Sequence, residues 1–269
     1  MARKRKIFRN IKLTLSYCGT RYHGWQKQIG VITVQEVLEQ AVATITGEQP
    51  SLVASGRTDA GVHAMGQVVN FRTESTIPLE GLVKGLNSIL PSDIAVLQAQ
   101  DVPWKFHAIG SSTSKKYQYL IVNSGVRLPL WEERAWVVTR GQLDVEAMRL
   151  ACGTLCGTHD FSSFTASGAS AKTRTRTVSE CSVNLPDHPL FPPVPGRQIM
   201  FTIAADGFLR YMVRNIVGLL VEIGLGRRDP SEIMEVIRAR DRSAAGPTAP
   251  PQGLYLMAVT YKPDAYNGR

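Results

Sequence analysis

Two spacings of hydrophobic residues alternate along the chain, and each predicts one kind of secondary structure. Between residues 11 and 17 apolar side chains occupy every second position, which is typical of a strand with one buried face. Between residues 34 and 45 they recur every three or four positions, which predicts a helix. Thr33 and Glu36 form a capping box at the start of this helix, and Gly47 ends it.

The same reasoning predicts the other elements. Strands are expected over residues 67–72, 94–100, 115–122, 134–138, 177–184, 198–205 and 254–261. Helices are expected over residues 79–90, after an Asp144 cap, over residues 208–224, and after Asp229 and Pro230. The proline-rich stretch around residues 186–197 is expected to be a loop.

The irregular alternation of strands and helices indicates an α+β fold. Strands follow one another directly at two places, so the sheets are expected to be largely antiparallel. The element order in the two halves is similar and suggests two ferredoxin-like (RRM-like) α/β units. We assign residues 1–105 to the N-terminal subdomain and residues 106–269 to the C-terminal one.

The charge balance points to a polyanionic partner. The 269 residues include 31 basic and 22 acidic ones, for a formal net charge of +9. Such an excess favours nucleic-acid binding, although a scattered excess that only aids solubility is the alternative. Basic clusters on predicted loops and helix ends can reach phosphates, among them Lys172, Arg174 and Arg176, and the pair Arg227 and Arg228.

Neither a membrane segment nor a metal site is predicted. No apolar run is long enough to span a bilayer, and the basic N-terminus lacks the apolar stretch of a signal peptide, so a cytoplasmic protein is expected. The four cysteines lack the spacing of a disulfide framework. Cys152, Cys156 and His159 could be imagined as zinc ligands, but no fourth ligand has suitable spacing.

Residues 55–64 are the strongest candidate for chemistry. Arg57 and Asp59 lie there between Gly56 and Gly61, on a segment too short and flexible for a core helix or strand. A carboxylate held in a cleft needs a cationic partner, whereas a turn with a weak surface salt bridge is the plainer alternative. His63 could add an acid–base group, and a structural histidine is the competing interpretation.

This loop resembles the catalytic loop of the tRNA pseudouridine synthase A family. Four further segments match that family in the same order, over residues 114–119, 157–164, 208–218 and 249–256. The resemblance implies two α/β units with their sheets joined across a basic cleft. It also implies an isomerase that converts uridine to pseudouridine at positions 38, 39 and 40 of the tRNA anticodon stem-loop, working as a homodimer. Because the reaction is an isomerisation, no cofactor is expected.

The resemblance also assigns roles to individual residues. It makes Asp59 the catalytic nucleophile, Arg214 its ion-pair partner and Tyr117 the active-site tyrosine. It implies that Arg57 fills the space left by a flipped base, and Leu254 is expected to wall the pocket. Arg210, one helical turn before Arg214, is a further candidate for substrate binding.

The residues alone leave alternatives open. Arg214 could line a solvated side of its helix, and Tyr117 cannot be separated from Tyr119 because both lie on one strand face. A non-catalytic RNA-binding module is the rival function, but such a module has no use for an acid among basic residues. A metal-dependent nuclease would need clustered carboxylates, and the loop offers one.

Overall fold

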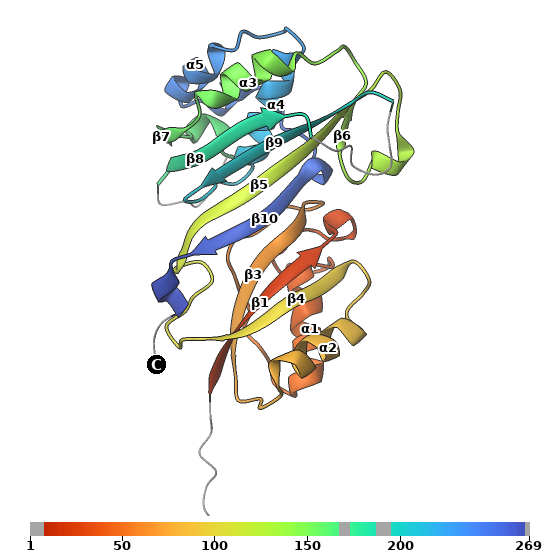
Figure 1. Cartoon of the computed structure of the whole chain (residues 1–269), viewed down its shortest axis with the longest axis vertical. Helices are drawn as coiled ribbons and strands as arrows, with labels where there is room; N and C mark the ends of the chain where they lie inside the picture. The colour runs from red at the N-terminus through yellow and green to blue at the C-terminus, as the bar shows by residue number, and fades with distance from the viewer. Residues whose placement is uncertain (1–7, 167–172, 187–194, 267–269) are drawn as a thin grey trace, which may run out of the picture. The chain divides into compact units, whose positions relative to one another are not determined.

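The chain divides into two compact units. The computed structural model describes residues 8–166, 173–186 and 195–266. Unit 1 comprises Met1–Thr113 and Leu256–Arg269, and unit 2 comprises Ser114–Tyr255 (Figure 1). The C-terminal segment therefore returns to the unit in which the chain begins.

Unit 1 is a sheet with two helices. Its elements are β1 (Arg9–Tyr17), α1 (Val34–Thr46), β2 (Val53–Ala54), β3 (His63–Thr73), α2 (Leu79–Ile89) and β4 (Ile94–Val102), with most of β10 (Leu254–Tyr261). The strand order is β4-β1-β3-β10, and β2 also pairs with β3. β1 runs antiparallel to both neighbours, with Leu13 opposite Val69 on β3 and Ala99 on β4.

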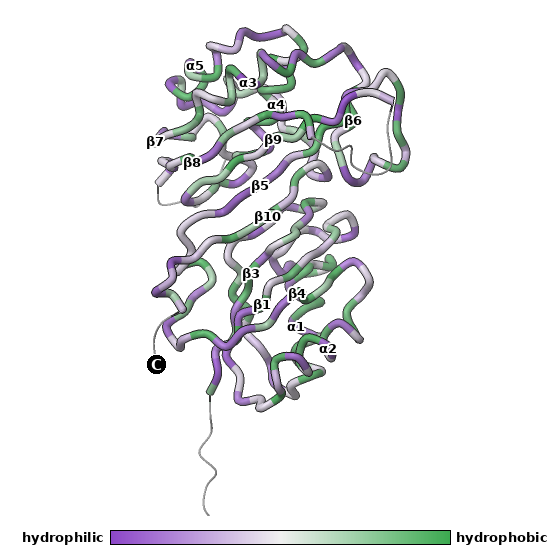
Figure 2. Tube along the Cα trace, viewed as in Figure 1, coloured by the Kyte–Doolittle hydropathy of each residue, from purple (hydrophilic) through white to green (hydrophobic). Residues whose placement is uncertain are grey.

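The core of unit 1 is formed by the apolar residues that recur at strand spacing in β1 and at helical spacing in α1. Along β1 the side chains of Ile11, Leu13 and Leu15 are buried, and α1 turns Leu38 and Val42 inward. Hydrophobic and hydrophilic stretches alternate along the strands, as Figure 2 shows. Helices α1 and α2 pack against each other, and α2 packs against β4.

The described residues of unit 2 form five further strands and three α-helices. Its elements are β5 (Ser112–Asn123), β6 (Trp136–Val138), α3 (Val145–Gly153), β7 (Gly157–Asp160), β8 (Thr175–Asn184), β9 (Arg197–Ala205), α4 (Met212–Gly224) and α5 (Glu232–Ala239). The order β5-β9-β8-β7 is antiparallel throughout, and β6 joins β5 in parallel. Helix α3 packs on β8 and on α4 (Figure 1).

Most of the predicted elements are confirmed. The mixed α/β class and the largely antiparallel pairing are correct, and Asp144 caps α3 by accepting from the backbone N–H groups of Glu146 and Ala147. Thr33 accepts from the N–H of Glu36, and Gly47 ends α1 with a φ of 73°. Short β2 and β7 were not predicted, because two to four residues give too little pattern.

Several predicted boundaries are wrong. The strand expected over residues 67–72 begins four residues earlier, at His63, so the last two residues of the 55–64 segment belong to β3 rather than to a loop. The helix expected over residues 208–224 begins only at Met212. Tyr211 has a left-handed backbone with a φ of 63°, which a right-handed helix cannot include. The strand expected over residues 134–138 is reduced to Trp136–Val138, since Arg134 and Ala135 bond to the carbonyl of Trp131 in a turn.

Two further expectations concern the chain as a whole. Within the described ranges, no helix combines the length and the apolarity needed to cross a membrane. All four cysteines are free, and the thiols of Cys152 and Cys181 touch where α3 meets β8. Most of the proline-rich loop lies outside the described residues.

Candidate active site

The loop between β2 and β3 carries Arg57 and Asp59, and its first residues are fastened to β3. The backbone N–H of Ser55 donates to Val68 O at 2.8 Å. The buried side chain of Gln67 accepts from Ser55 Oγ at 2.8 Å and donates from Nε2 to Gly56 O at 2.9 Å. One fully buried amide therefore fixes both residues that enter the loop.

Thr58 anchors the centre of the loop. Its Oγ1 lies 2.8 Å from Tyr17 Oη in the core, and its carbonyl accepts from Trp25 N–H at 3.0 Å. Burial raises the pKa of Tyr17 to about 12, so the phenol stays neutral at physiological pH. Gly24 packs so closely against the same carbonyl that a Cβ at this position would lie 2.6 Å from Thr58 O.

The residues on either side of Thr58 are turned away from the core. Arg57 is exposed and Asp59 is half-buried. The carbonyl of Asp59 accepts from Val62 N–H at 3.1 Å, and Gly61 completes this turn with a φ of 77°. The loop thus carries the Asp59 carboxylate two residues after the Arg57 guanidinium, on a backbone that the hydrogen bonds of Thr58 hold in place.

His63 has a structural contact. Its side chain is 2% exposed, and its Nδ1 accepts from Gly19 N–H at 3.0 Å. Accepting at Nδ1 leaves the proton of a neutral imidazole on Nε2. This bond ties the beginning of β3 to the short turn Gly19–Arg21.

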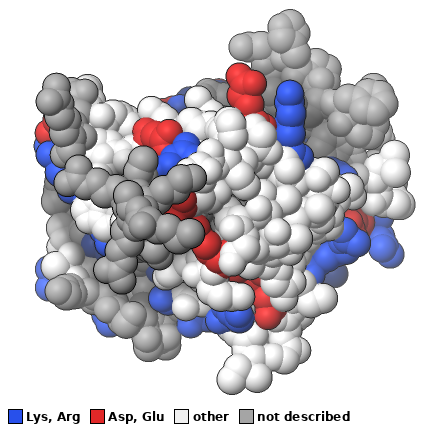
Figure 3. All heavy atoms as spheres, turned by 90° about the horizontal axis from the view of Figure 1, so that it is seen from below, with Lys and Arg blue, Asp and Glu red and all other residues white. Residues whose placement is uncertain are grey.

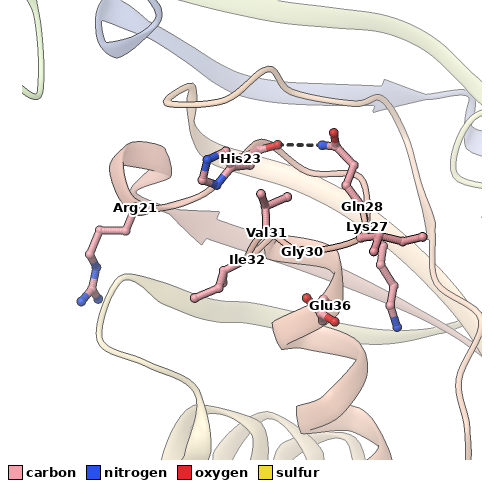
Figure 4. A pocket seen from close by; sticks show the side chains of 9 residues that line it. Arg21, His23, Lys27, Gln28, Gly30, Val31, Ile32 and Glu36 are labelled. Atoms are coloured by element: carbon pink, nitrogen blue, oxygen red, sulfur yellow. Dashed lines mark hydrogen bonds between the residues drawn. The ribbon is translucent and has the colours of Figure 1, made fainter.

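Unit 1 also has a surface hollow of about 880 Å³, and none of the residues that line it belongs to the loop. It is lined by residues of the segment between the Gly19–Arg21 turn and α1, including Arg21, His23, Lys27 and Ile32 (Figure 4). Gln28 closes one side by donating to His23 O at 3.1 Å. The segment that lines the hollow also contacts the loop, because the backbone N–H of Trp25 donates to Thr58 O.

In unit 2 both tyrosines of β5 are buried, and they have different neighbours. Tyr119 is fully buried and its hydroxyl donates to Pro250 O at 2.6 Å. Burial holds the pKa of the Tyr119 phenol well above its ordinary value. Tyr117 lies opposite Ile203 and packs edge-on against Phe208, with ring centroids 5.0 Å apart. The hydroxyl of Tyr119 therefore has a structural role.

Arg214 lies on α4 and is half-buried, whereas Arg210 precedes the helix and is exposed. Arg214 Nε donates to Ala249 O at 2.8 Å, and Arg214 O accepts from Ala249 N–H at 3.0 Å. Both guanidinium groups lie over the ring of Tyr211, at 4.8 Å for Arg214 and 4.9 Å for Arg210. The structure thus brings these two sequence-predicted arginines together on one aromatic ring.

The remaining candidates occupy different environments. Leu254, the first residue of β10, is buried. Arg174 is exposed, while Arg176 is half-buried and donates from Nη1 to the carbonyls of Thr173 and Thr175. Burial, together with the charge of Arg176, lowers the pKa of Lys115. Lys172 lies outside the described residues.

The candidates are divided between the units. Arg57 and Asp59 belong to unit 1, and Tyr117, Arg174, Arg176, Arg210, Arg214 and Leu254 belong to unit 2. On the face that Figure 3 shows, basic side chains lie apart from one another, with acidic ones among them. The part of the chain that the structure describes holds no group of three or more histidine, cysteine or acidic residues suited to a metal ion.

Sequence reasoning did not find the residues that support the loop. Tyr17 on β1, Gly24 in the segment before α1 and Gln67 on β3 contact it. The sequence offered one clue to these residues. Gln67 is a polar residue within β3, at a position that is fully buried. A buried amide needs partners, and here those partners are Ser55 and Gly56.

Comparison with known proteins identifies the family of this chain. A family model described as tRNA pseudouridine synthase matches residues 14–109 and 151–262, which include Asp59 and Arg214. The chain belongs to the tRNA pseudouridine synthases, isomerases that convert uridine to pseudouridine in tRNA.

Its relatives carry a more particular name. A tRNA pseudouridine synthase A from Acetivibrio thermocellus is 46% identical over 253 residues, which cover 94% of this chain and 100% of the relative. The enzyme of that name from Thermoanaerobacter sp. (strain X514) is 44% identical over 253 residues, with the same coverage. A chain in the crystal structure of the archaeal box H/ACA sRNP Nop10-Cbf5 complex covers 78% of this chain and 44% of itself, at 12% identity and a TM-score of 0.36, too distant to carry weight.

Proposed function

We propose that Asp59 is the nucleophile that attacks the target uridine, and that the target lies in the tRNA anticodon stem-loop at positions 38, 39 and 40. The observation that carries this proposal is the loop at residues 55–62. Its half-buried carboxylate is held on a backbone fixed by Tyr17, Gln67 and Trp25. A carboxylate can act covalently on the ribose or the base, and a fixed backbone lowers the entropic cost of aligning it.

The other residues follow from this role. Arg57 fills the space left when the uridine is unstacked, which lowers the cost of flipping. Arg214 pairs with Asp59, and a guanidinium stabilises the charged carboxylate. Tyr117 stacks on the pyrimidine and moves a proton, and Leu254 walls the pocket. In this assignment residues 1–105 supply the nucleophile, and residues 106–269 supply the tyrosine and the arginines.

The tRNA is held by basic side chains. Arg174, Arg210 and Arg176 contact phosphates, together with Lys172. The enzyme acts as a homodimer on one tRNA, in the cytoplasm. A strictly monomeric and fully active protein in analytical ultracentrifugation would contradict the dimer.

We also infer that each unit is ferredoxin-like. In unit 1 the order β4-β1-β3, with β2 beside β3, follows the fourth, first, third and second strands of a βαββαβ repeat. In unit 2 β5, β9 and β8 lie in the corresponding first, third and second places. The joining of the two sheets across a basic cleft remains part of this proposal.

Mapping of pseudouridine in tRNA tests the target. Unmodified tRNA transcripts with uridine at positions 38, 39 and 40 are incubated with the protein, and pseudouridine is located by carbodiimide adducts that stop reverse transcription. We expect new stops at those positions. Matched transcripts with cytidine there should give none. Stops confined to other parts of the tRNA would overturn the anticodon assignment while leaving the isomerase activity intact.

A further inference from the structure

The residue that precedes α4 has an unusual backbone. Tyr211 has φ 63° and ψ 3°, the left-handed region. Among the described residues, only Arg240 shares a positive φ without being glycine. A side chain with a Cβ is strained in this region, whereas glycine would avoid the strain. Strain of this kind tends to persist where the side chain has a function, so the ring of Tyr211 is the feature to explain.

The ring of Tyr211 contacts two cations. The guanidinium carbon of Arg214 lies 4.8 Å from the ring centroid and that of Arg210 lies 4.9 Å from it. Arg210 Nη2 is also 3.4 Å from Tyr211 Oη. An aromatic face attracts a guanidinium by about 0.5–2 kcal/mol and adds no negative charge. A tyrosine can therefore order two arginines without neutralising either one, whereas a carboxylate in its place would.

The guanidinium of Arg214 is held by a hydrogen bond as well as by the ring of Tyr211. Arg214 Nε donates to Ala249 O at 2.8 Å, so a carbonyl holds one atom while the ring holds the face. The backbone bond from Ala249 N–H to Arg214 O fixes that carbonyl relative to the helix. Together these contacts leave the guanidinium plane little freedom to rotate.

We propose that Tyr211 is a positioning residue for Arg214. The proposal rests on the role proposed for Arg214. The ring of Tyr211 covers the face of the guanidinium while Ala249 O accepts from its Nε, so the two contacts together set the direction in which Arg214 presents its remaining N–H groups.

Three substitutions separate the ring from the backbone. Tyr211→Phe keeps the ring and loses the hydroxyl. Tyr211→Asn loses the ring but suits a positive φ, because asparagine is the residue after glycine that best tolerates it. Tyr211→Leu loses the ring and keeps the strain. Thermal melting of each variant identifies any that fails to fold, and the asparagine variant is expected to be at least as stable as the wild type.

Turnover and arginine dynamics are then measured. We expect Tyr211→Phe to keep kcat within about threefold of the wild type, and Tyr211→Asn and Tyr211→Leu to lose about tenfold in kcat, the equivalent of a lost cation–π contact. KM should change less than kcat. In NMR spectra, the Nε–H of Arg214 should exchange with water about tenfold faster in Tyr211→Asn than in the wild type, and should be unchanged in Tyr211→Phe.

The two readouts distinguish the two possible failures. Wild-type kcat and wild-type exchange in the asparagine variant would overturn the positioning role. Equal losses in the phenylalanine and asparagine variants would also overturn it, because the hydroxyl would then be the group that matters. If Arg214→Ala kept full activity, the proposed role of Arg214 would fail, yet faster exchange in Tyr211→Asn would still support the contact itself.

Discussion

The hydroxyl of Tyr17 lies 2.8 Å from Oγ1 of Thr58, and this contact joins the last residue of β1 to the residue beside Asp59. Tyr17 is 4% exposed and Thr58 is 6% exposed, so water does not compete for this bond. The loop therefore has a fixed point within one residue of its carboxylate. A loop set on a rigid strand in this way is suited to holding a reacting group in place.

The alkaline stability of the protein should depend on Tyr17. Its pKa is raised to about 12 by burial, above the unfolded value of about 10. Its contribution is therefore fully present below about pH 10 and is lost as the pH rises through 12. Urea unfolding across pH 8–12 should show a free energy that falls less steeply in Tyr17→Phe, by up to about 1.4 kcal/mol per pH unit. Identical slopes in the two proteins would contradict this assignment.

Gly24 and Gly30 form a matched pair for testing the support of the loop. Both have a positive φ, of 86° and 81°, but a Cβ at residue 24 meets Thr58 O at 2.6 Å, whereas one at residue 30 meets nothing within 4 Å. Each alanine should cost about 1–2 kcal/mol in backbone strain. Only Gly24→Ala should also displace the loop and lower kcat by about tenfold or more. Comparable kcat values in the two variants would show that the loop does not depend on this approach.

Tyr117 and Tyr119 can be compared by removing one oxygen from each. Tyr119→Phe breaks the bond to Pro250 O and should lower stability by about 1 kcal/mol while turnover stays near the wild-type value. Tyr117→Phe should abolish turnover and leave tRNA binding intact, because the ring still stacks. Steady-state kinetics and filter binding measure both effects. An active Tyr117→Phe variant would limit this tyrosine to stacking.

The salt dependence of tRNA binding tests the basic residues of unit 2. Each phosphate contact contributes a slope of about 0.7–0.9 in log K against log salt. The double change of Arg174 and Arg176 to glutamine should flatten that slope by up to about two contacts and weaken binding, while saturating turnover changes little. Arg134→Gln with Arg149→Gln removes the same charge elsewhere in unit 2. Equal flattening in both double variants would mean that the slope reports net charge rather than this segment.

The sequence predicted the elements that follow from the spacing of apolar residues. It missed the features that depend on how individual residues contact one another. Alternation along residues 11–17 is enough to predict β1, since one face must be buried. The start of α4 was wrong because Tyr211 has a left-handed backbone, and the spacing of apolar residues does not record a single backbone angle. The roles of Tyr117 and Tyr119 could not be separated by pattern either, because the acceptor of Tyr119 lies far along the chain at Pro250.

The most direct test of the central claim is tritium release from tRNA that carries 5-tritiated uridine, measured with Asp59→Asn. Replacing the carboxylate with an amide keeps the size of the side chain and removes the nucleophile. We expect release to fall to the level seen without enzyme, with tRNA affinity unchanged or slightly higher. Asp101→Asn, which alters an exposed carboxylate paired with Arg9 in the same unit, should keep full activity. Release by Asp59→Asn near the wild-type rate would contradict the assignment of Asp59 as the nucleophile.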